Sequence, residues 1–316
     1  MEEVVQLVPP ALMAGGHQIY QTDSPADLDP LDPDQMVGAH GRNCTTLAAA
    51  NALQPLDDRI VFDEDTHTYH VDGVRVPTSV TSILKKVLDE TPFDANLIIT
   101  KNLASWRRNP RSKYNSVVEG KDDSAAVSAI KKQWSDANRL GTKLHAVLEF
   151  YLNGELVGSE LENDQETKVE WGATKMAVDS LIAMGAKPYR TELSVFWTNP
   201  EGKIVCAGQM DVLMKCDEGG ELVLCDLKRT DKPLDAEAVP FGEKKCVAPL
   251  EDEYANDHTK YSLQLACYSV MLEQTTGLKV PPANRFLLRS HPSSPKSELI
   301  GCKDFDKEAR QILDAL

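Results

Sequence analysis

The stretch that decides the fold spans residues 204–228 and has the sequence IVCAGQMDVLMKCDEGGELVLCDLK. Two strand-like segments, Ile204–Met214 and Leu222–Leu227, flank a turn with two consecutive glycines. Their alternation is typical of antiparallel strands with one buried face. Pairing of the segments brings Asp211 close to Asp226. Carboxylates at that separation repel each other, and a divalent cation relieves the repulsion, so the stretch predicts a cation site on a sheet.

Lys228 completes an Asp-x-Lys motif with Asp226. Side chains in a strand repeat with period two, so the ammonium and the carboxylate point to the same face. This arrangement suits metal-assisted hydrolysis of a phosphodiester, in which the lysine positions the attacking water and stabilises developing charge. Acid-to-lysine spacing is also common on exposed strands, so the motif alone does not separate a catalytic site from a solvated strand.

Two helical segments add polar side chains at regular spacing. In residues 141–150, GTKLHAVLEF, His145 and Glu149 are four positions apart and share one helical face. Gln264 and Tyr268 have the same spacing in a later helix. Each pair has a structural alternative, either a core histidine bonded to the backbone or a contact on the helix surface.

The order of these motifs, G-T-x-x-H-x-x-x-E, G-x-x-D, D-x-K and Q-x-x-x-Y, resembles the RecB-like branch of the PD-(D/E)XK nuclease superfamily over roughly residues 59–316. That branch includes bacterial recombination exonucleases, CRISPR-adaptation nucleases and mitochondrial single-strand exonucleases. The resemblance implies a restriction-endonuclease-like fold and a DNA nuclease that depends on Mg²⁺ or Mn²⁺. We expect an exonuclease that acts on single-stranded DNA ends in replication, repair or recombination.

The resemblance also implies residue roles. The implied metal ligands are the side chains of His145, Asp211 and Asp226 and the backbone carbonyl of Leu227. Lys228 is the implied catalytic lysine, and Gln264 and Tyr268 order the scissile strand or the lysine. An imidazole ligand favours tolerance of manganese beside magnesium.

Three further residues have open roles. Glu149 is either a partner of the metal's water or an acid that stabilises its helix. Glu192, in the strand Tyr189–Trp197, matches an acid of many relatives and either assists the metal or Lys228 or belongs to the scaffold. Arg229 follows the lysine where relatives often have threonine, and it either packs on a helix or reaches a phosphate.

The formal net charge of −15 is unusual for a nucleic-acid enzyme. Residues 1–66 contain twelve acidic residues and two arginines, so ten of the net negative charges lie there. Basic residues cluster between positions 101 and 143 with Trp106 and Trp134 among them, a composition typical of a single-strand groove but also of solvated helix faces. The candidate DNA-binding residues are Arg107, Arg108, Arg111, Lys113 and Arg229.

Composition narrows the class of protein. The sequence has no run of eighteen apolar residues and no secretory signal, so we expect an intracellular protein without a membrane partner. Seven scattered cysteines without a C-x-x-C pair favour reduced thiols and argue against a zinc site and against an iron–sulfur cluster. The expected partner is DNA with a single strand or a free end, and a helicase or replication protein is a further candidate.

We expect an acidic, mostly disordered leader over residues 1–58 with a short helix in 45–53, followed by a nuclease domain over 59–316. This domain divides into a β-hairpin and helical part, 59–185, and a catalytic core, 186–316, that includes helix 136–153. The fold class is α/β, an α/β/α core with a mixed, largely antiparallel central sheet, a helical insertion and a small N-terminal β-hairpin unit. The expected strands are 60–62, 68–71, 74–76, 189–197, 204–214, 222–227 and 285–289, and the expected helices are 79–88, 93–106, 124–152 with a break at Gly141, 165–184, 261–275 and one from 304. The long loop 231–258 is expected to border the substrate channel.

Two alternatives to the DNA nuclease stay open. One is a catalytically silent nucleic-acid-binding or assembly subunit of a helicase–nuclease complex. The other is a metal-dependent ribonuclease with the same sheet.

Overall fold

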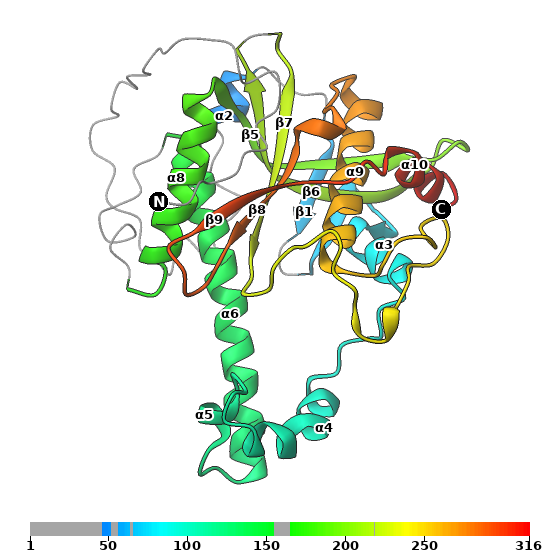
Figure 1. Ribbon diagram of the computed structural model, residues 1–316. Coiled ribbons are helices and arrows are strands. Elements are labelled where there is room, and N and C mark those ends of the chain that lie inside the picture. The colour runs from blue at the N-terminus through cyan, green and yellow to red at the C-terminus, as the bar shows by residue number, and fades with distance from the viewer. Residues whose placement is uncertain (1–45, 52–55, 64–65, 155–164, 218) are drawn as a thin grey trace. The chain divides into compact units, whose positions relative to one another are not determined.

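The computed structural model describes residues 46–51, 56–63, 66–154, 165–217 and 219–316 (Figure 1). Its contacts divide the chain into two compact units. One unit takes the residues up to Glu90 together with Leu144–Leu316, and the other is Thr91–Lys143. The second unit corresponds to the expected helical insertion. Most of the expected leader, 1–58, lies outside the described residues, and its described part contains the short helix α2 (Thr46–Ala50).

A mixed sheet forms the centre of the first unit. Among the described residues it has six strands, in the order β4-β6-β7-β8-β9, with β5 paired to β6. The strands are β4 (Thr78–Ser79), β5 (Ala186–Thr198), β6 (Ile204–Cys216), β7 (Leu222–Arg229), β8 (Arg285–Ser290) and β9 (Ser297–Gly301). The β4–β6 and β7–β8 pairs are parallel and the other pairs are antiparallel, which confirms a mixed α/β protein with a mixed central sheet.

Helices cover both faces of this sheet (Figure 1). The C-terminal part of α6 (Asp123–Leu152) and α8 (Lys168–Ala183) enclose one apolar core with the sheet. The helices α3 (Val80–Val87), α9 (Asp257–Thr276) and α10 (Asp306–Asp314) enclose the other. Because both faces are covered, every residue of β7 from Leu222 to Leu227 is buried. The expectation of one buried face is therefore wrong for this strand.

The N-terminal hairpin unit is confirmed. Its strands are β1 (Ile60–Asp63), β2 (Thr68–Val71) and β3 (Val74–Arg75). The turn between β2 and β3 needs two left-handed residues, and Asp72 (φ 51°) and Gly73 (φ 77°) supply them. Ser79 then caps α3 by accepting a hydrogen bond from the backbone N–H of Ser82 (3.3 Å).

Some elements differ from the expectation. The short strands β4 and β9 were not expected, because a two-residue strand has no periodicity and β9 has the polar sequence SELIG. The short helices α5 (Asn115–Val118), η2 (Phe241–Glu243) and η3 (Pro282–Asn284) are also additional. Helix α6 is continuous through Gly141, so the break expected there is absent from this described helix.

In the second unit, α4 (Ala95–Arg108), α5 and the first part of α6 share a small apolar core. The Trp106 and Tyr114 ring centroids are 4.4 Å apart, and Trp134 Nε1 donates a hydrogen bond to Tyr114 Oη (2.9 Å). Both tryptophans are half-buried and pack against this core.

A buried ion pair joins β7 to α8. Arg229 Nε and Nη2 donate to the two carboxylate oxygens of Glu170 (2.6 and 2.8 Å), and both side chains are almost fully buried. Glu170→Ala leaves the guanidinium buried without this partner, so we predict a loss of about 3–5 kcal/mol in the free energy of unfolding, measured with urea. The exposed pair Lys187–Asp217 is the control, and Asp217→Ala should cost less than about 1 kcal/mol. Equal losses in the two variants would contradict this assignment.

Candidate metal centre

Strand β6 changes partners along one of its edges. Residues 212–215 of β6 pair with β7, and residues 206–207 pair with β4. The other edge of β6 is occupied by β5 over its whole length. The segment between, Gly208–Asp211, has no partner on the first edge among the described strands, and β7 beyond Cys225 pairs only with β8. The two strands therefore separate where Asp211 and Asp226 lie.

The side chain of Asp211 fills the gap that this separation opens. Its Oδ2 accepts a hydrogen bond from the backbone N–H of Leu227 (2.7 Å). A carboxylate thus replaces the backbone carbonyl that a continued ladder would offer to β7. This bond fixes Asp211 beside the Asp226-Leu227-Lys228 segment, as the sequence predicts.

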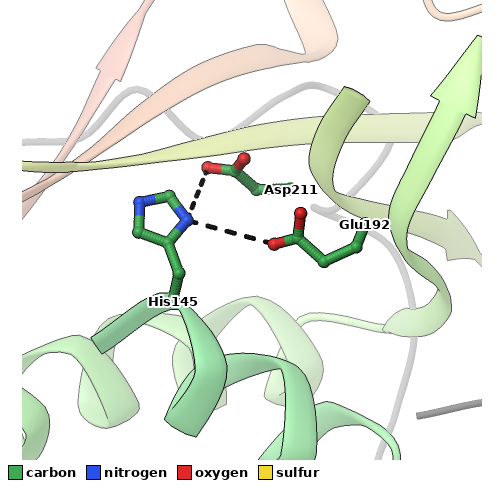
Figure 2. Close-up of side chains that lie close together, drawn as sticks. All are labelled: His145, Glu192 and Asp211. Carbon is green, nitrogen blue, oxygen red and sulfur yellow. Dashed lines mark ion pairs between the residues drawn. The ribbon is translucent and has the colours of Figure 1, made fainter. Parts of the chain in front are cut away.

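Three side chains from three elements converge at this point (Figure 2). His145 of α6 places Nδ1 3.4 Å from Asp211 Oδ2 and 4.0 Å from Glu192 Oε1 of β5. One ligand atom from each residue lies within 4.8 Å of the others. Carboxylate oxygens with one imidazole are a donor set for a divalent cation such as Mn²⁺ or Mg²⁺.

Glu192 reaches this group through an unusual backbone conformation. Its φ is 45°, in the left-handed region that costs a side-chain-bearing residue about 1–2 kcal/mol. The flanking pairs Thr191↔Val212 and Leu193↔Met210 place it opposite Asp211. Gln209 Nε2 donates to the Glu192 carbonyl (2.9 Å) and helps to hold this conformation. Such strain is found at functional sites, where the surrounding contacts maintain it.

Asp226, which is buried, and Lys228, whose side chain is 19% exposed, form an ion pair next to the three residues. Lys228 Nζ lies 2.5 Å from Asp226 Oδ2 and 4.7 Å from the centre of the Tyr261 ring. The carboxylate is buried, and its Oδ1 has no hydrogen-bond partner among the described residues. Buried carboxylate oxygens normally have such partners, so this oxygen is suited to a cation.

Burial raises the pKa values of two carboxyl groups of the site, those of Glu192 and Asp226. Burial, followed by the neighbouring Asp211, Glu149 and Asp226, raises the pKa of Glu192 well above its ordinary range. Burial also raises the pKa of Asp226 to about 6, although Lys228 opposes the shift. Four carboxyl groups thus act on one another in a buried space, and a divalent cation would offset the cost. The residues present fit such an ion.

Helix α9 brings Gln264 and Tyr268 to the separated edge of β6. Gln264 Nε2 donates to Tyr268 Oη (2.8 Å), so the two residues act as one unit. The Tyr268 ring packs on Gly208, where an added Cβ would lie 2.4 Å from Tyr268 Cε1 and 3.0 Å from Val80 Cγ2. The glycine of the G-x-x-D motif is therefore required for the close approach of this tyrosine.

The remaining candidate residues of the motifs are buried or paired within the first unit. Leu227 is a core residue whose N–H holds Asp211, and Glu149 is buried near enough to raise the pKa of Glu192. Arg229 packs on a helix, one of its two expected roles, with Glu170 holding its guanidinium.

The remaining candidates for DNA binding, Arg107, Arg108, Arg111 and Lys113, belong to the second unit. Within it, Arg107 pairs with Asp123 (2.5 Å), Arg108 donates to the Ala104 carbonyl (3.2 Å) and Lys113 lies over the Tyr114 ring (5.6 Å).

Sequence reasoning missed two tyrosines of this site. Tyr261 precedes Gln264 by three residues on α9, a helical spacing that signals a shared face. Tyr69 belongs to β2 of the hairpin unit, and burial, followed by the nearby Glu192 and Asp211, raises its pKa. No local pattern marks Tyr69, because its proximity depends on the packing of β2 against the sheet.

No family model and no curated protein matches the chain. Among the described residues, no helix combines the length and the apolar composition needed to cross a membrane.

We predict that the chain binds Mn²⁺ at this centre, which isothermal titration calorimetry can measure. His145→Ala, Glu192→Gln and Asp211→Asn each remove one ligand and should weaken binding by about tenfold or more. The control Asp217→Asn changes an exposed carboxylate that pairs with Lys187, and it should bind Mn²⁺ like the wild type. Unchanged affinity in all three ligand variants would contradict the assignment.

Gly208→Ala should lower the free energy of unfolding by about 1–3 kcal/mol, because its methyl group collides with the buried Tyr268 ring. Gly172→Ala in α8 is the matched control, since no atom lies within 4 Å of its added Cβ. That variant should gain up to about 1 kcal/mol from helix propensity. Urea unfolding of both variants checks the prediction, and a neutral Gly208→Ala would contradict the close packing.

The raised pKa of Asp226 gives a signed dependence of stability on pH. The folded state holds this proton more tightly than the unfolded state, whose pKa is about 4. The resulting stability is present below about pH 4 and is lost as the pH rises through about 6. In EDTA, Asp226→Asn, which cannot ionise, should therefore gain stability relative to the wild type between pH 4 and 7. If the stability difference between Asp226→Asn and the wild type does not change with pH, the raised pKa of Asp226 is contradicted.

Proposed function

We propose that the chain is a divalent-metal-dependent nuclease that hydrolyses phosphodiester bonds. The observation that carries this proposal is the meeting of a three-residue ligand group, His145, Glu192 and Asp211, with the Asp-x-Lys motif where β6 and β7 separate. A ligand group alone fits many metal proteins. The added lysine, which is largely but not fully buried, is the feature that favours transfer at a phosphate, where negative charge develops.

The side chains of His145, Glu192 and Asp211 would hold the cation, with Asp226 as a further oxygen ligand. The backbone carbonyl of Leu227 would be another ligand of the cation, as the resemblance implies. The bound cation would polarise a phosphate oxygen and lower the pKa of a water molecule. The buried surroundings strengthen the interactions of these charges with a phosphate.

Lys228 would act as a charged donor. Burial lowers its pKa, but Asp226 and Asp211 outweigh burial and raise the pKa above its ordinary value. The side chain therefore stays an ammonium at neutral pH and donates hydrogen bonds without accepting a proton. Its role is to orient the attacking water and to stabilise the charge that forms on the phosphate oxygens.

The mixed sheet with helices on both faces is compatible with the restriction-endonuclease-like fold and with the RecB-like branch of the PD-(D/E)XK superfamily. The motifs occur on α6, β6, β7 and α9 in the order that the resemblance requires. On this basis we propose DNA with a single strand or a free end as the substrate, exonucleolytic cleavage, and a role in replication, repair or recombination beside a helicase or replication protein.

End-labelled single-stranded DNA, incubated with Mn²⁺, Mg²⁺ or EDTA, tests the proposal. We predict metal-dependent cleavage by the wild type that Lys228→Ala reduces by at least about a hundredfold, because the variant loses the donor to the phosphate. Mn²⁺ affinity, measured separately, should persist in Lys228→Ala. Asp217→Ala serves as the active control.

Other outcomes favour the alternatives. An equally rapid cleavage of RNA, or of RNA alone, would favour the ribonuclease. DNA binding without cleavage in either metal would contradict the nuclease and favour the silent binding subunit.

A further inference from the structure

The inner face of α9 carries three polar residues at helical spacing. Tyr261, Gln264 and Tyr268 follow one another at intervals of three and four, so they share one face of the helix. Tyr268 packs on Gly208 of β6, and Tyr261 lies against Lys228 of β7. The helix thus contacts both separated strands. Of the three residues, Tyr261 is the one that lies outside the Q-x-x-x-Y motif.

Lys228 has two contacts of different kinds. Its Nζ lies 2.5 Å from Asp226 Oδ2, and it lies over the Tyr261 ring at 4.7 Å from the ring centre, within the range of a cation–π interaction. Asp226 is also a proposed ligand of the cation, and a carboxylate that binds a cation interacts less strongly with an ammonium. Divalent cations such as Mg²⁺ prefer oxygen ligands to an aromatic face, so the proposed cation would not compete for the Tyr261 ring.

The first turn of α9 is fixed independently of the metal centre. Asn256 caps the helix by accepting from the Thr259 N–H (2.8 Å), and its amide donates to the Ala238 carbonyl (2.9 Å) of the preceding loop. Lys260 pairs with Glu90 (2.6 Å) beyond the end of α3. The ring of Tyr261 is therefore held in position before any substrate binds.

We propose that Tyr261 is a positioning residue that holds the ammonium of Lys228 at the metal centre through the face of its ring. The proposal rests on the proposed nuclease function for its catalytic consequence. Tyr261 keeps Lys228 directed at the phosphate when Asp226 contacts the cation. The ring face performs this role, so the hydroxyl group of Tyr261 is not required.

The kinetic test compares Tyr261→Leu with Tyr261→Phe on end-labelled single-stranded DNA with Mn²⁺. Tyr261→Leu should lower kcat by about tenfold, the size expected of a partly desolvated cation–π contact, with KM and the Mn²⁺ affinity within about twofold of the wild type. Tyr261→Phe should retain the wild-type kcat. The matched control is Tyr151→Leu in α6, which removes the ring beneath Lys175 of α8 (4.8 Å) and should leave kcat unchanged. A wild-type kcat in Tyr261→Leu overturns the proposal.

A spectroscopic test does not depend on activity. In protein labelled with ¹³C at the lysine Cε, the Lys228 resonance, assigned by its loss in Lys228→Arg, should be shifted upfield by the ring current of Tyr261. The shift should persist in Tyr261→Phe and disappear in Tyr261→Leu, with thermal unfolding showing that both variants are folded. If the wild type cleaves no nucleic acid, the proposed nuclease function is contradicted. The Lys228 resonance then tests the role of Tyr261 by itself, and an unshifted signal overturns that role.

Discussion

The separation of β6 from β7 is the constraint on which the candidate site depends. Continuous pairing would place backbone bonds where Asp211 now accepts the N–H of Leu227. It would also close the space in which the side chains of His145 and Glu192 meet Asp211 (Figure 2). On either side of the gap, the two strands keep backbone hydrogen bonds, because β4 pairs in parallel with the other end of β6 and β7 pairs in parallel with β8. The sheet thus opens without losing its order.

The separation of β6 from β7 brings charged groups into a largely buried site, and their burial costs free energy. Burial raises the pKa values of Glu192 and Asp226, and the largely buried ammonium of Lys228 lies against Asp226. The strained backbone of Glu192 adds to the cost. An arrangement that only stabilised the fold would have little reason to collect these groups, since well-packed apolar residues serve at least as well. The divalent cation that we propose would offset the cost of collecting these groups.

The sequence predicted the elements with strong local patterns. The Asp72-Gly73 turn, the capped helix α3 and the strands that carry Asp211 and Asp226 depend on neighbouring residues alone, and they lie where expected. The position of Glu192 depends on the left-handed φ and the register with β6, neither of which has a local signature. The short strand β4 likewise forms because the adjacent edge of β6 is open to it.

The central claim is that a cation binds where β6 and β7 separate. The most direct test is a crystal of the protein soaked in Mn²⁺ and measured for anomalous scattering at the manganese edge. The account predicts a peak with His145 nitrogen and the Asp211 and Glu192 oxygens at about 2.0–2.3 Å, typical of such ligands. Manganese peaks elsewhere in the crystal, with no peak at this centre and with Glu192 still in contact only with protein groups, would contradict the claim.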